Sequence, residues 1–303
     1  MPNWGQVLTE IEAQDARLAN GAKSAVDLVR RKYLKKLHKK TGRNVIAYYS
    51  GWLTNPSAFG IDVNDEDKAA FMMAIHGLDK TKGLDLILHT PGGGIAAAES
   101  LVDYLRRVFG CDVRAIVPHL AMSAGTMIAC TCKSIIMGKQ SNLGPIDPQL
   151  GGLPAAAVKK EIERAIAEIK ASPERLQFWQ FVLSKYTPTF IGQCEQAVIM
   201  AAEFVRDRLL DNMLKDDPEA PQKADAIVTG LSDVDDNKSH ARHIHIDKCE
   251  ALGLKIEHLE DDQELQEAVL TVHHCFMHSL GESGAAKMVE NQNGAAFIKL
   301  PAQ

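Results

Sequence analysis

The sequence predicts a mixed α/β domain built around a largely parallel sheet, with helical additions at both ends. Between residues 44 and 137, short runs rich in β-branched residues alternate with longer helical stretches, which is the pattern of βαβ units. The chain has 303 residues, of which 46% are hydrophobic and 24% charged, so it can bury a sizeable core. Two switches from strand to helix fall on turns of glycine or other small residues, where open α/β sheets gather functional groups.

The first forty residues predict a helical N-terminal arm, which we assign to residues 1–43. Residues 5–40 contain little glycine or proline and repeat apolar residues at helical spacing. The stretch from Arg30 to Arg43 carries eight lysines and arginines and no acid. This basic run could contact anionic lipid at a membrane surface, or nucleic acid. A solvated helix face or a subunit contact explains it as well, and we favour that interpretation.

The next elements predict the sheet and its crossover helices. Strands are expected at 44–49, 84–88, 113–117 and 134–137, and helices at 64–78, 95–109 and 123–132. Later segments predict helices at 153–169, 173–184 and 188–214, an exposed polar connection at 215–240 with a short helix, and a last helix at 263–282. We therefore divide the chain into the arm (1–43), a central α/β domain with a helical insertion (44–262), and a C-terminal helix and tail (263–303).

Composition excludes several classes of protein. A formal net charge of −5 argues against nucleic-acid binding over the whole surface, and no specific nucleic acid is expected as a partner. The chain does not begin with a basic segment followed by an apolar one, and it has no run of about eighteen uncharged apolar residues, so we expect neither secretion nor a membrane span. The six cysteines lack the spacing of a disulfide framework and predict free thiols in a cytoplasmic protein.

Two turns carry groups that could do chemistry. Ser123 stands between small residues where a predicted strand gives way to a helix, and the amide of Ala124 at that helix start could hold the oxyanion of an attacked carbonyl. The run from His89 to Gly94, HTPGGG, could supply a second amide, because glycine lets the backbone turn without a Cβ in the way. We choose Gly93, with its two neighbouring glycines next. Taken alone, such a serine is more often only a helix cap.

Together these motifs resemble a known family. HTPGGG, then MSAGT about thirty residues on, then SNLGPIDPQLGG are similar to the serine dehydrogenase proteinase branch of the Clp-fold serine peptidases. That branch is related to the proteolytic subunit of the Clp protease and to signal peptide peptidase A, and it shares the fold of crotonases. The resemblance covers residues 44–152, with a fainter echo at 246–254. It implies a three-layer Clp/crotonase-like fold, Ser123 as nucleophile, Gly93 and Ala124 as the oxyanion hole, and no cofactor.

The general base is where the sequence departs from the Clp protease pattern. The segment that should carry its histidine reads GPIDPQ, with Asp147 at that place. The resemblance to signal peptide peptidase A implies a buried lysine with a depressed pKa as base instead. In those relatives the lysine follows the glycine-containing strand and begins a helix, which points to Lys159 or Lys160, and Lys185, before the helix predicted at 188–214, is another candidate. A Ser/Lys dyad is therefore favoured over a Ser/His/Asp triad.

The histidines are interpreted as structural. His89 and His119 border the two turns, where a role in packing a loop is commoner than one in lining a site. His240, His243 and His245 alternate along what we expect to be an extended surface or subunit-contact segment, and no carboxylate partner of a metal site is evident.

No metal is expected. Cys130 and Cys132 are too close for a CxxC chelate and lack a second cysteine pair. His274 and His278 lie four residues apart in the last predicted helix, but the glutamate of the HExxH motif is missing.

The leading functional hypothesis is hydrolysis of peptide bonds through an acyl-enzyme on Ser123, with a peptide or protein as substrate. Two alternatives remain: a crotonase-like acyl-thioester enzyme, and a catalytically silent assembly protein with the same fold. The resemblance also implies a homo-oligomeric ring. Because no GxxxxGKS phosphate loop occurs, ATP-driven unfolding of substrates would need a separate partner.

Overall fold

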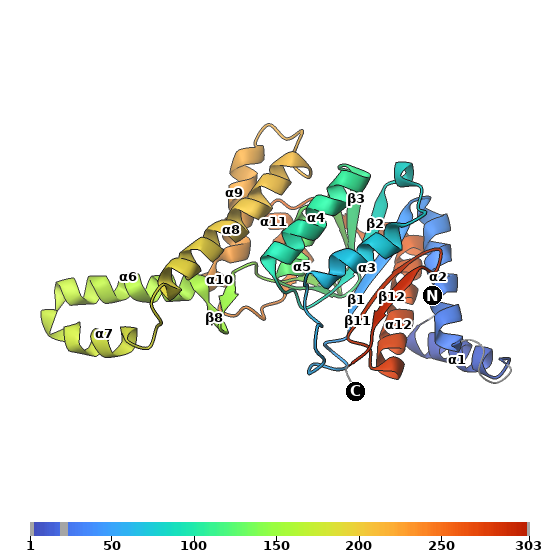
Figure 1. Ribbon diagram of the computed structural model, residues 1–303. Helices are drawn as coiled ribbons and strands as arrows, with labels where there is room; N and C mark the ends of the chain where they lie inside the picture. Colours follow the sequence, from blue (N-terminus) through green and yellow to red (C-terminus); the bar gives the residue numbers. More distant parts are fainter. Residues whose placement is uncertain (1–2, 19–23, 302–303) are drawn as a thin grey trace.

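The computed structural model describes residues 3–18 and 24–301 and has a mixed α/β architecture (Figure 1). Its main sheet has the strand order β10-β5-β3-β2-β1-β11-β12. The pairings from β10 through β1 are parallel, and those of β11 with β1 and β12 are antiparallel. The strands are β1 (Asn44–Ser50), β2 (Leu84–His89), β3 (Val113–Val117), β5 (Ser134–Met137), β10 (Ile256–His258), β11 (Lys287–Asn291) and β12 (Ala296–Lys299).

Both faces of the sheet are covered, which explains why its strands read as nearly continuous apolar runs. Along β1, Ile46 and Tyr48 enter one core, whereas Val45, Ala47 and Tyr49 enter the other. The first core is closed by α3 (Glu66–Ile75), α4 (Ile95–Phe109), α5 (Ala124–Cys130), α8 (Phe190–Asp211), α9 (Ala220–Ser232) and α11 (Ile246–Ala251). The second is closed by α1 (Trp4–Asp15), α2 (Ala25–Thr41) and α12 (Gln263–Ser283) (Figure 1).

Short elements complete the chain around the edges of this sheet. A second, three-stranded sheet has the order β4-β6-β9, and a two-residue hairpin joins β7 to β8. Their bounds are β4 (Leu120–Ala121), β6 (Asn142–Leu143), β7 (Gln149–Leu150), β8 (Leu153–Pro154) and β9 (Ile244–His245), with α10 (Val234–Asn237) and 3-10 turns at Lys80–Lys82, Pro173–Arg175 and Leu259–Asp261.

The predicted α/β class with a largely parallel sheet is confirmed. Helix 95–109 and strands 113–117 and 134–137 match the structure residue for residue. The last helix was also predicted to within one residue. These are the elements whose apolar spacing is most regular, since each buries a complete face or stripe.

Two expectations about the second half of the chain are wrong. Residues 215–240 are not simply an exposed connection, because α9 buries Ala224, Ile227 and Leu231 completely in the first core. The stretch beyond residue 283 is not a tail, because β11 and β12 extend the sheet. Buried charged residues in β11 broke the apolar pattern on which the prediction relied.

The arginines of the basic run pack against the molecule, whereas its five lysines are exposed. Arg30 is fully buried on α2, and its Nε lies 2.5 Å from a carboxylate oxygen of Glu290 on β11. The guanidinium of Arg43 pairs with Asp85 at 2.7 Å and with Asp112 at 3.0 Å. Residues 19–23 of the predicted arm lie outside the described residues. The proposed division into domains and the lipid contact stay predictions.

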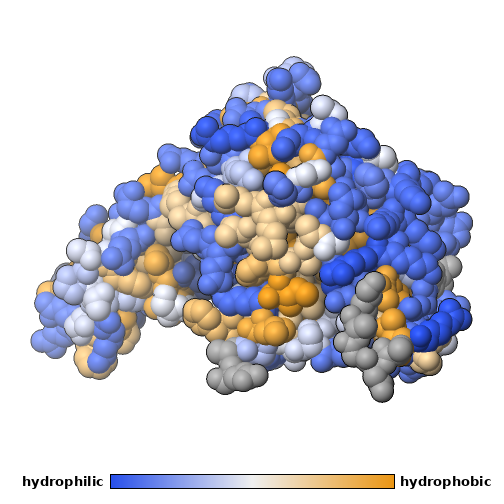
Figure 2. Space-filling model, turned by 45° about the vertical axis from the view of Figure 1, so that its right-hand side comes forward, coloured by the Kyte–Doolittle hydropathy of each residue, from blue (hydrophilic) through white to orange (hydrophobic). Residues whose placement is uncertain are grey.

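A helical projection leaves the body of the molecule at the left of Figure 1. It consists of α6 (Ala155–Ala171), α7 (Leu176–Leu183) and the start of α8, around a small core of Ala155, Val158 and Cys194. Apolar side chains remain on its surface, also visible at the left of Figure 2, and Phe178 and Phe181 are 56% and 66% exposed. In the ranges 3–18 and 24–301, no helix combines the length and apolarity that crossing a bilayer requires.

Candidate active site

Ser123 occupies a strained turn directly before α5. Its backbone has φ 50° and ψ −117°, a region that L-residues rarely adopt, and its side chain forms no capping hydrogen bond to the helix start. Strain of this kind costs about 1–3 kcal/mol and is typical of functional turns. A serine on a sharp strand-to-helix turn presents its hydroxyl outward, as in the nucleophile elbow of hydrolases. Ser123 is therefore not an ordinary helix cap.

Neighbouring backbone groups hold this turn rigidly. The amide of Met122 donates to the carbonyl of Thr90 at 3.0 Å, and the amide of Thr90 donates to the carbonyl of Leu120 at 3.1 Å. The buried hydroxyl of Thr126 donates to the carbonyl of Ala121 at 2.8 Å and accepts from the amide of Gly144 at 2.9 Å. These bonds join the turn to the end of β2 and to β6, so the hydroxyl of Ser123 is presented at a fixed place.

The glycine turn after β2 packs against this serine. A Cβ added to Gly92, whose φ is +95°, would lie 2.5 Å from the Cβ of Ser123. A Cβ on Gly93, whose φ is +155°, would lie 2.3 Å from the amide nitrogen of Val63. Only glycine fits at either position, so the two predicted turns meet without a side chain between them.

The hydrogen bonds of the glycine turn leave one amide free. Gly92 donates to the hydroxyl of Thr90 at 3.2 Å, and Gly94 donates to the carbonyl of Val63 at 2.8 Å. Within the described residues, the amide of Gly93 donates to no protein acceptor. Ala124, as the first residue of α5, likewise has no acceptor one turn back in its own helix. These two amides are the donors that the predicted oxyanion hole requires.

Ser123 opens into a cavity of about 630 Å³ at the carboxyl end of the parallel strands. Its wall combines the glycine turn, the loop after β6, one residue of α8, and a histidine. Its lining residues are Ile61, Asp62, Pro91, Gly92, Gly93, Gly94, Ile95, Ser123, Met127, Pro148, Gln149, Leu150, Ala197 and His240.

The histidine in this wall is held by a buried carboxylate. His240 Nδ1 lies 2.9 Å from Asp147 Oδ1, and the side chain of Asp147 is only 4% exposed. The other oxygen of Asp147 accepts from Gln149 Nε2 at 2.8 Å. With Nδ1 engaged by the carboxylate, Nε2 is the ring nitrogen left to accept a proton. Ser123 and His240 line the same cavity, and in the described residues no hydrogen bond joins them.

The short pairing of β6 with β9 brings the chain segments that carry these two residues side by side. The antiparallel register sets Asn142 opposite His245 and Leu143 opposite Ile244. The pairing ends there, because beyond β6 the amide of Ile146 donates to the carbonyl of Leu231 at 3.0 Å, and Asp147 and His240 meet through their side chains. The expectation that His240 belongs to an extended surface segment is wrong, since residues 239–241 form a turn and only Ile244–His245 is a strand. Both residues stood out in the sequence, but 93 positions separate them.

The three predicted lysines lie away from Ser123. Lys159, Lys160 and Lys185 are all exposed, and none of them lines its cavity. Lys160 Nζ pairs with Asp235 at 2.5 Å, in a smaller cavity that Asp147 and His240 also border. Lys185 Nζ lies 4.6 Å from the ring centroid of Phe181 on the projection. The structure therefore brings together Ser123, Gly93 and Ala124, but it brings none of these lysines to them.

His89 and His119 join His273 of α12 in a cluster behind the two turns. The ring centroids are 5.3 to 5.7 Å apart, and His89 is fully buried. Burial lowers the pKa of all three imidazoles, that of His273 to about 3, so the cluster is neutral at physiological pH. Across the described ranges, no three His, Cys, Asp or Glu side chains are arranged to hold a metal ion.

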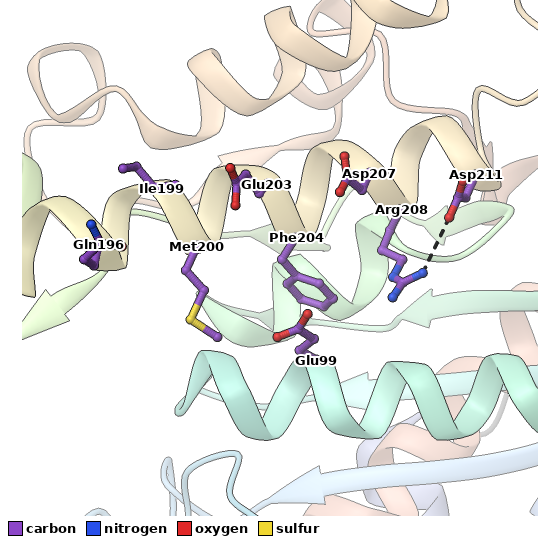
Figure 3. A pocket seen from close by; sticks show the side chains of 9 residues that line it. All are labelled: Glu99, Gln196, Ile199, Met200, Glu203, Phe204, Asp207, Arg208 and Asp211. Atoms are coloured by element: carbon purple, nitrogen blue, oxygen red, sulfur yellow. Dashed lines mark hydrogen bonds and ion pairs between the residues drawn. The ribbon is translucent and has the colours of Figure 1, made fainter.

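A second cavity, of about 310 Å³, lies between α4 and α8 (Figure 3). It begins one helical turn beyond the Ser123 cavity, since Ile95 lines the first and Glu99 the second. Its walls carry Glu99, Glu203 and Asp207, together with Arg208 at 3.5 Å from Asp211. Without a nucleophile or a paired histidine, this cavity is not the candidate active site.

Comparisons with known proteins assign the chain to a family. The family described as ClpP-like SDH-type serine proteinase matches residues 20–271. The uncharacterized protein MJ0137 of Methanocaldococcus jannaschii is 31% identical over 278 residues, which are 89% of this chain and 87% of that protein. The uncharacterized protein MJ1495 of the same organism is 28% identical over 191 residues, which are 63% of this chain and 58% of that protein. The predicted resemblance is confirmed: the chain belongs to the ClpP-like SDH-type serine proteinase family.

Proposed function

We propose that this protein hydrolyses peptide bonds with a catalytic triad of Ser123, His240 and Asp147. One observation carries the proposal: a strained, non-capping serine shares a cavity with a histidine whose Nδ1 is 2.9 Å from a buried carboxylate. A nucleophile, a base and a group that orients the base are the parts this chemistry needs.

The reaction follows from these positions. Ser123 Oγ attacks the scissile carbonyl carbon while His240 Nε2 takes the hydroxyl proton, and Asp147 stabilises the imidazolium. The amides of Gly93 and Ala124 donate hydrogen bonds to the tetrahedral oxyanion. The imidazolium proton passes to the leaving amine as the C–N bond breaks. Water then attacks the acyl-enzyme with His240 again as base, which releases the carboxylic acid and returns the proton to Ser123.

The triad replaces the Ser/Lys dyad in our preferred mechanism because of burial and position. A lysine base must be desolvated to lose its proton near neutral pH, whereas the three lysine candidates are exposed. Lys160 pairs with Asp235, and Lys185 contacts the ring of Phe181; within the described residues, neither lysine contacts Ser123. The chain order Ser, Asp, His is compatible with this chemistry, because triads recur in several orders on unrelated folds.

The two alternatives receive less support. An acyl-thioester enzyme would need a free carboxylate for proton transfer, but Asp147 is already committed to His240 and Gln149. A silent assembly protein would have no reason to keep Ser123 in a strained conformation without a capping bond.

Labelling with a fluorophosphonate probe tests the proposal. Wild-type protein should be labelled and Ser123→Ala should not, because the probe reports an activated serine. Asp147→Asn should slow peptide hydrolysis about 10⁴-fold, since the imidazole loses the carboxylate that fixes its tautomer. His240→Gln should slow both reactions strongly.

Lys160→Ala is the matched control, because Lys160 borders the neighbouring cavity beside His240 but has an exposed partner. It should label and hydrolyse at the wild-type rate. If Lys160→Ala abolished labelling while His240→Gln left it intact, the lysine dyad would replace the triad. An unlabelled wild-type protein would favour the silent assembly protein.

We also infer that the protein forms a homo-oligomer through the helical projection. The exposed rings of Phe178 and Phe181 support this, since a monomer rarely leaves several large apolar side chains in water on one element. Light scattering should give a mass that is a multiple of the 33.1 kDa chain, and Phe181→Glu should lower it. A monomeric wild-type protein at micromolar concentration would contradict the inference.

A further inference from the structure

A buried ion pair lies behind the glycine turn of the candidate site. Lys287 on β11 and Asp67 on α3 are each 1% exposed, and Lys287 Nζ lies 2.6 Å from Asp67 Oδ1. The second oxygen of Asp67 accepts from the hydroxyl of Tyr48 at 2.8 Å. Burial lowers the pKa of Lys287. Removing two charges from water is costly, and a protein with two apolar residues of similar size in their place is often equally or more stable. The charges at this position therefore call for an explanation other than stability.

The ion pair holds both ends of a three-residue segment, Asp62 to Asn64. Lys287 Nζ donates to the backbone carbonyl of Asp62 at 2.7 Å. The carboxylate of Asp67 accepts from the backbone amide of Asn64 at 2.9 Å. The position of the middle residue, Val63, is therefore fixed by a cation on one side and an anion on the other.

Val63 in turn fixes the glycine turn. Its amide donates to the carbonyl of Gly92 at 2.7 Å, and its carbonyl accepts from the amide of Gly94 at 2.8 Å. The residue between these two, Gly93, lies so close to the Val63 backbone that a Cβ would be 2.3 Å from the Val63 nitrogen. With both neighbouring peptide groups bonded, the free amide of Gly93 has one orientation.

We propose that Lys287 and Asp67 are positioning residues that hold the Gly93 amide in the oxyanion hole. The inference rests on the proposed peptidase function and adds to it the device that orients one of its two donors. Lys287 does not touch the reacting atoms. It acts through Asp62, Val63 and the glycine turn, and a displacement of that turn weakens the hydrogen bond that stabilises the transition state.

The experiment compares Lys287→Met with a control variant, Asp85→Asn. Asp85 is also fully buried and pairs with Arg43 and Arg114, but it lies near the start of β2, at the other end of the strand from the glycine turn. Both variants lose a buried ion pair, so both should lose stability. Rates are measured per folded molecule, at a temperature where circular dichroism shows both variants folded.

Lys287→Met should lower kcat for a peptide substrate about 10- to 100-fold with KM changed by less than about threefold, because displacing a donor costs somewhat less than the 10²- to 10³-fold of removing one. Affinity for a peptide boronate, which carries the tetrahedral geometry, should fall in parallel. Asp85→Asn should keep the wild-type kcat. Equal kcat in the two variants would overturn the positioning role.

Should Lys287→Met fail to fold, Tyr48→Phe removes one bond to Asp67 while leaving the charges paired, and it should shift kcat in the same direction by a smaller factor.

A second measurement does not depend on activity. Hydrogen–deuterium exchange of the peptide covering residues 90–95 should accelerate in Lys287→Met and stay at the wild-type rate in Asp85→Asn, because the Gly94 amide loses its fixed acceptor. Unchanged exchange would refute the positioning role even in an active enzyme. Accelerated exchange in Lys287→Met, in a protein whose wild type hydrolyses no peptide, would support the positioning of the glycine turn by the ion pair and refute the peptidase proposal.

Discussion

Acidification from about pH 7.5 to about pH 5.5 should destabilise this protein through its buried histidine cluster. Burial holds the pKa of His273 at about 3, whereas an imidazole in the unfolded chain titrates near 6.5. The folded-state pKa is the lower one, so the stability is fully present above about pH 6.5. It declines as the pH falls toward 3, because only the unfolded chain takes up the proton.

The magnitude follows from proton linkage. One group that binds a proton with a pKa near 6.5 when unfolded, and stays neutral when folded, lowers the free energy of unfolding by about 1.4 kcal/mol over these two pH units. His89 acts in the same direction, because its ring is fully buried and burial lowers its pKa too. The exposed pair of His258 with Glu250 has the opposite sign, since the pKa of His258 is raised, but exposed pairs contribute little.

The groups that face the cluster do not compensate for this effect. Tyr49 of β1 offers its hydroxyl at 3.2 Å from His273 Nδ1, and the ring of Trp52 lies 4.3 Å from that of His89. Neither is an anion at these pH values, and burial raises the pKa of Tyr49 still further. The neighbouring histidines act on each other as like charges once protonated.

Urea unfolding of wild-type protein and His273→Phe at both pH values provides the test. The variant lacks the hydrogen bond to Tyr49, which lowers its free energy of unfolding by the same amount at both pH values. Between about pH 7.5 and about pH 5.5, its free energy of unfolding should fall by about 1.4 kcal/mol less than that of wild type. Equal pH dependence in the two proteins, or a wild-type stability that does not change between them, would refute the account of the cluster.

Three further outcomes are expected. Ser123→Gly should raise the unfolding temperature by a few degrees while abolishing activity, because glycine relieves about 1–3 kcal/mol of backbone strain, and calorimetry that showed no rise would contradict the strain argument. Gly93→Ala should remove most peptidase activity and lower stability, since its Cβ would meet the Val63 backbone at 2.3 Å, and wild-type kinetics in this variant would exclude Gly93 as a donor. Glu290→Gln should cost about 1.5–3 kcal/mol in denaturant unfolding, because buried Arg30 would lose a charged hydrogen bond and keep only Asp27 as an anionic partner, and a change below about 1 kcal/mol would show that this pair adds little.

The part of the fold that was predicted from the sequence is the part where side-chain burial follows a regular period. Strand β3 and helix α4 were predicted to the residue because their apolar positions recur at intervals of a strand and a helix. Strand β11 follows no such pattern, since Lys287, Glu290 and Asn291 are all buried in it. Each is paired with a residue more than 200 positions away, and no local rule reports such partners. The strand was therefore taken for a tail.

The same distinction separates the proposed nucleophile from its proposed base. The turn at Ser123 and the glycine turn are both local motifs, and parallel strands bring their carboxyl ends to one edge of the sheet, so their meeting could be inferred. The base depends on β6 and β9, which are two residues long each and give no strand signal of their own. Their pairing brings together the chain segments that carry Asp147 and His240, although neither residue belongs to a strand. In the triad that we propose, the aspartate that stands where the Clp protease pattern has a histidine therefore serves in a different chain order, and the histidine comes from the turn that precedes β9.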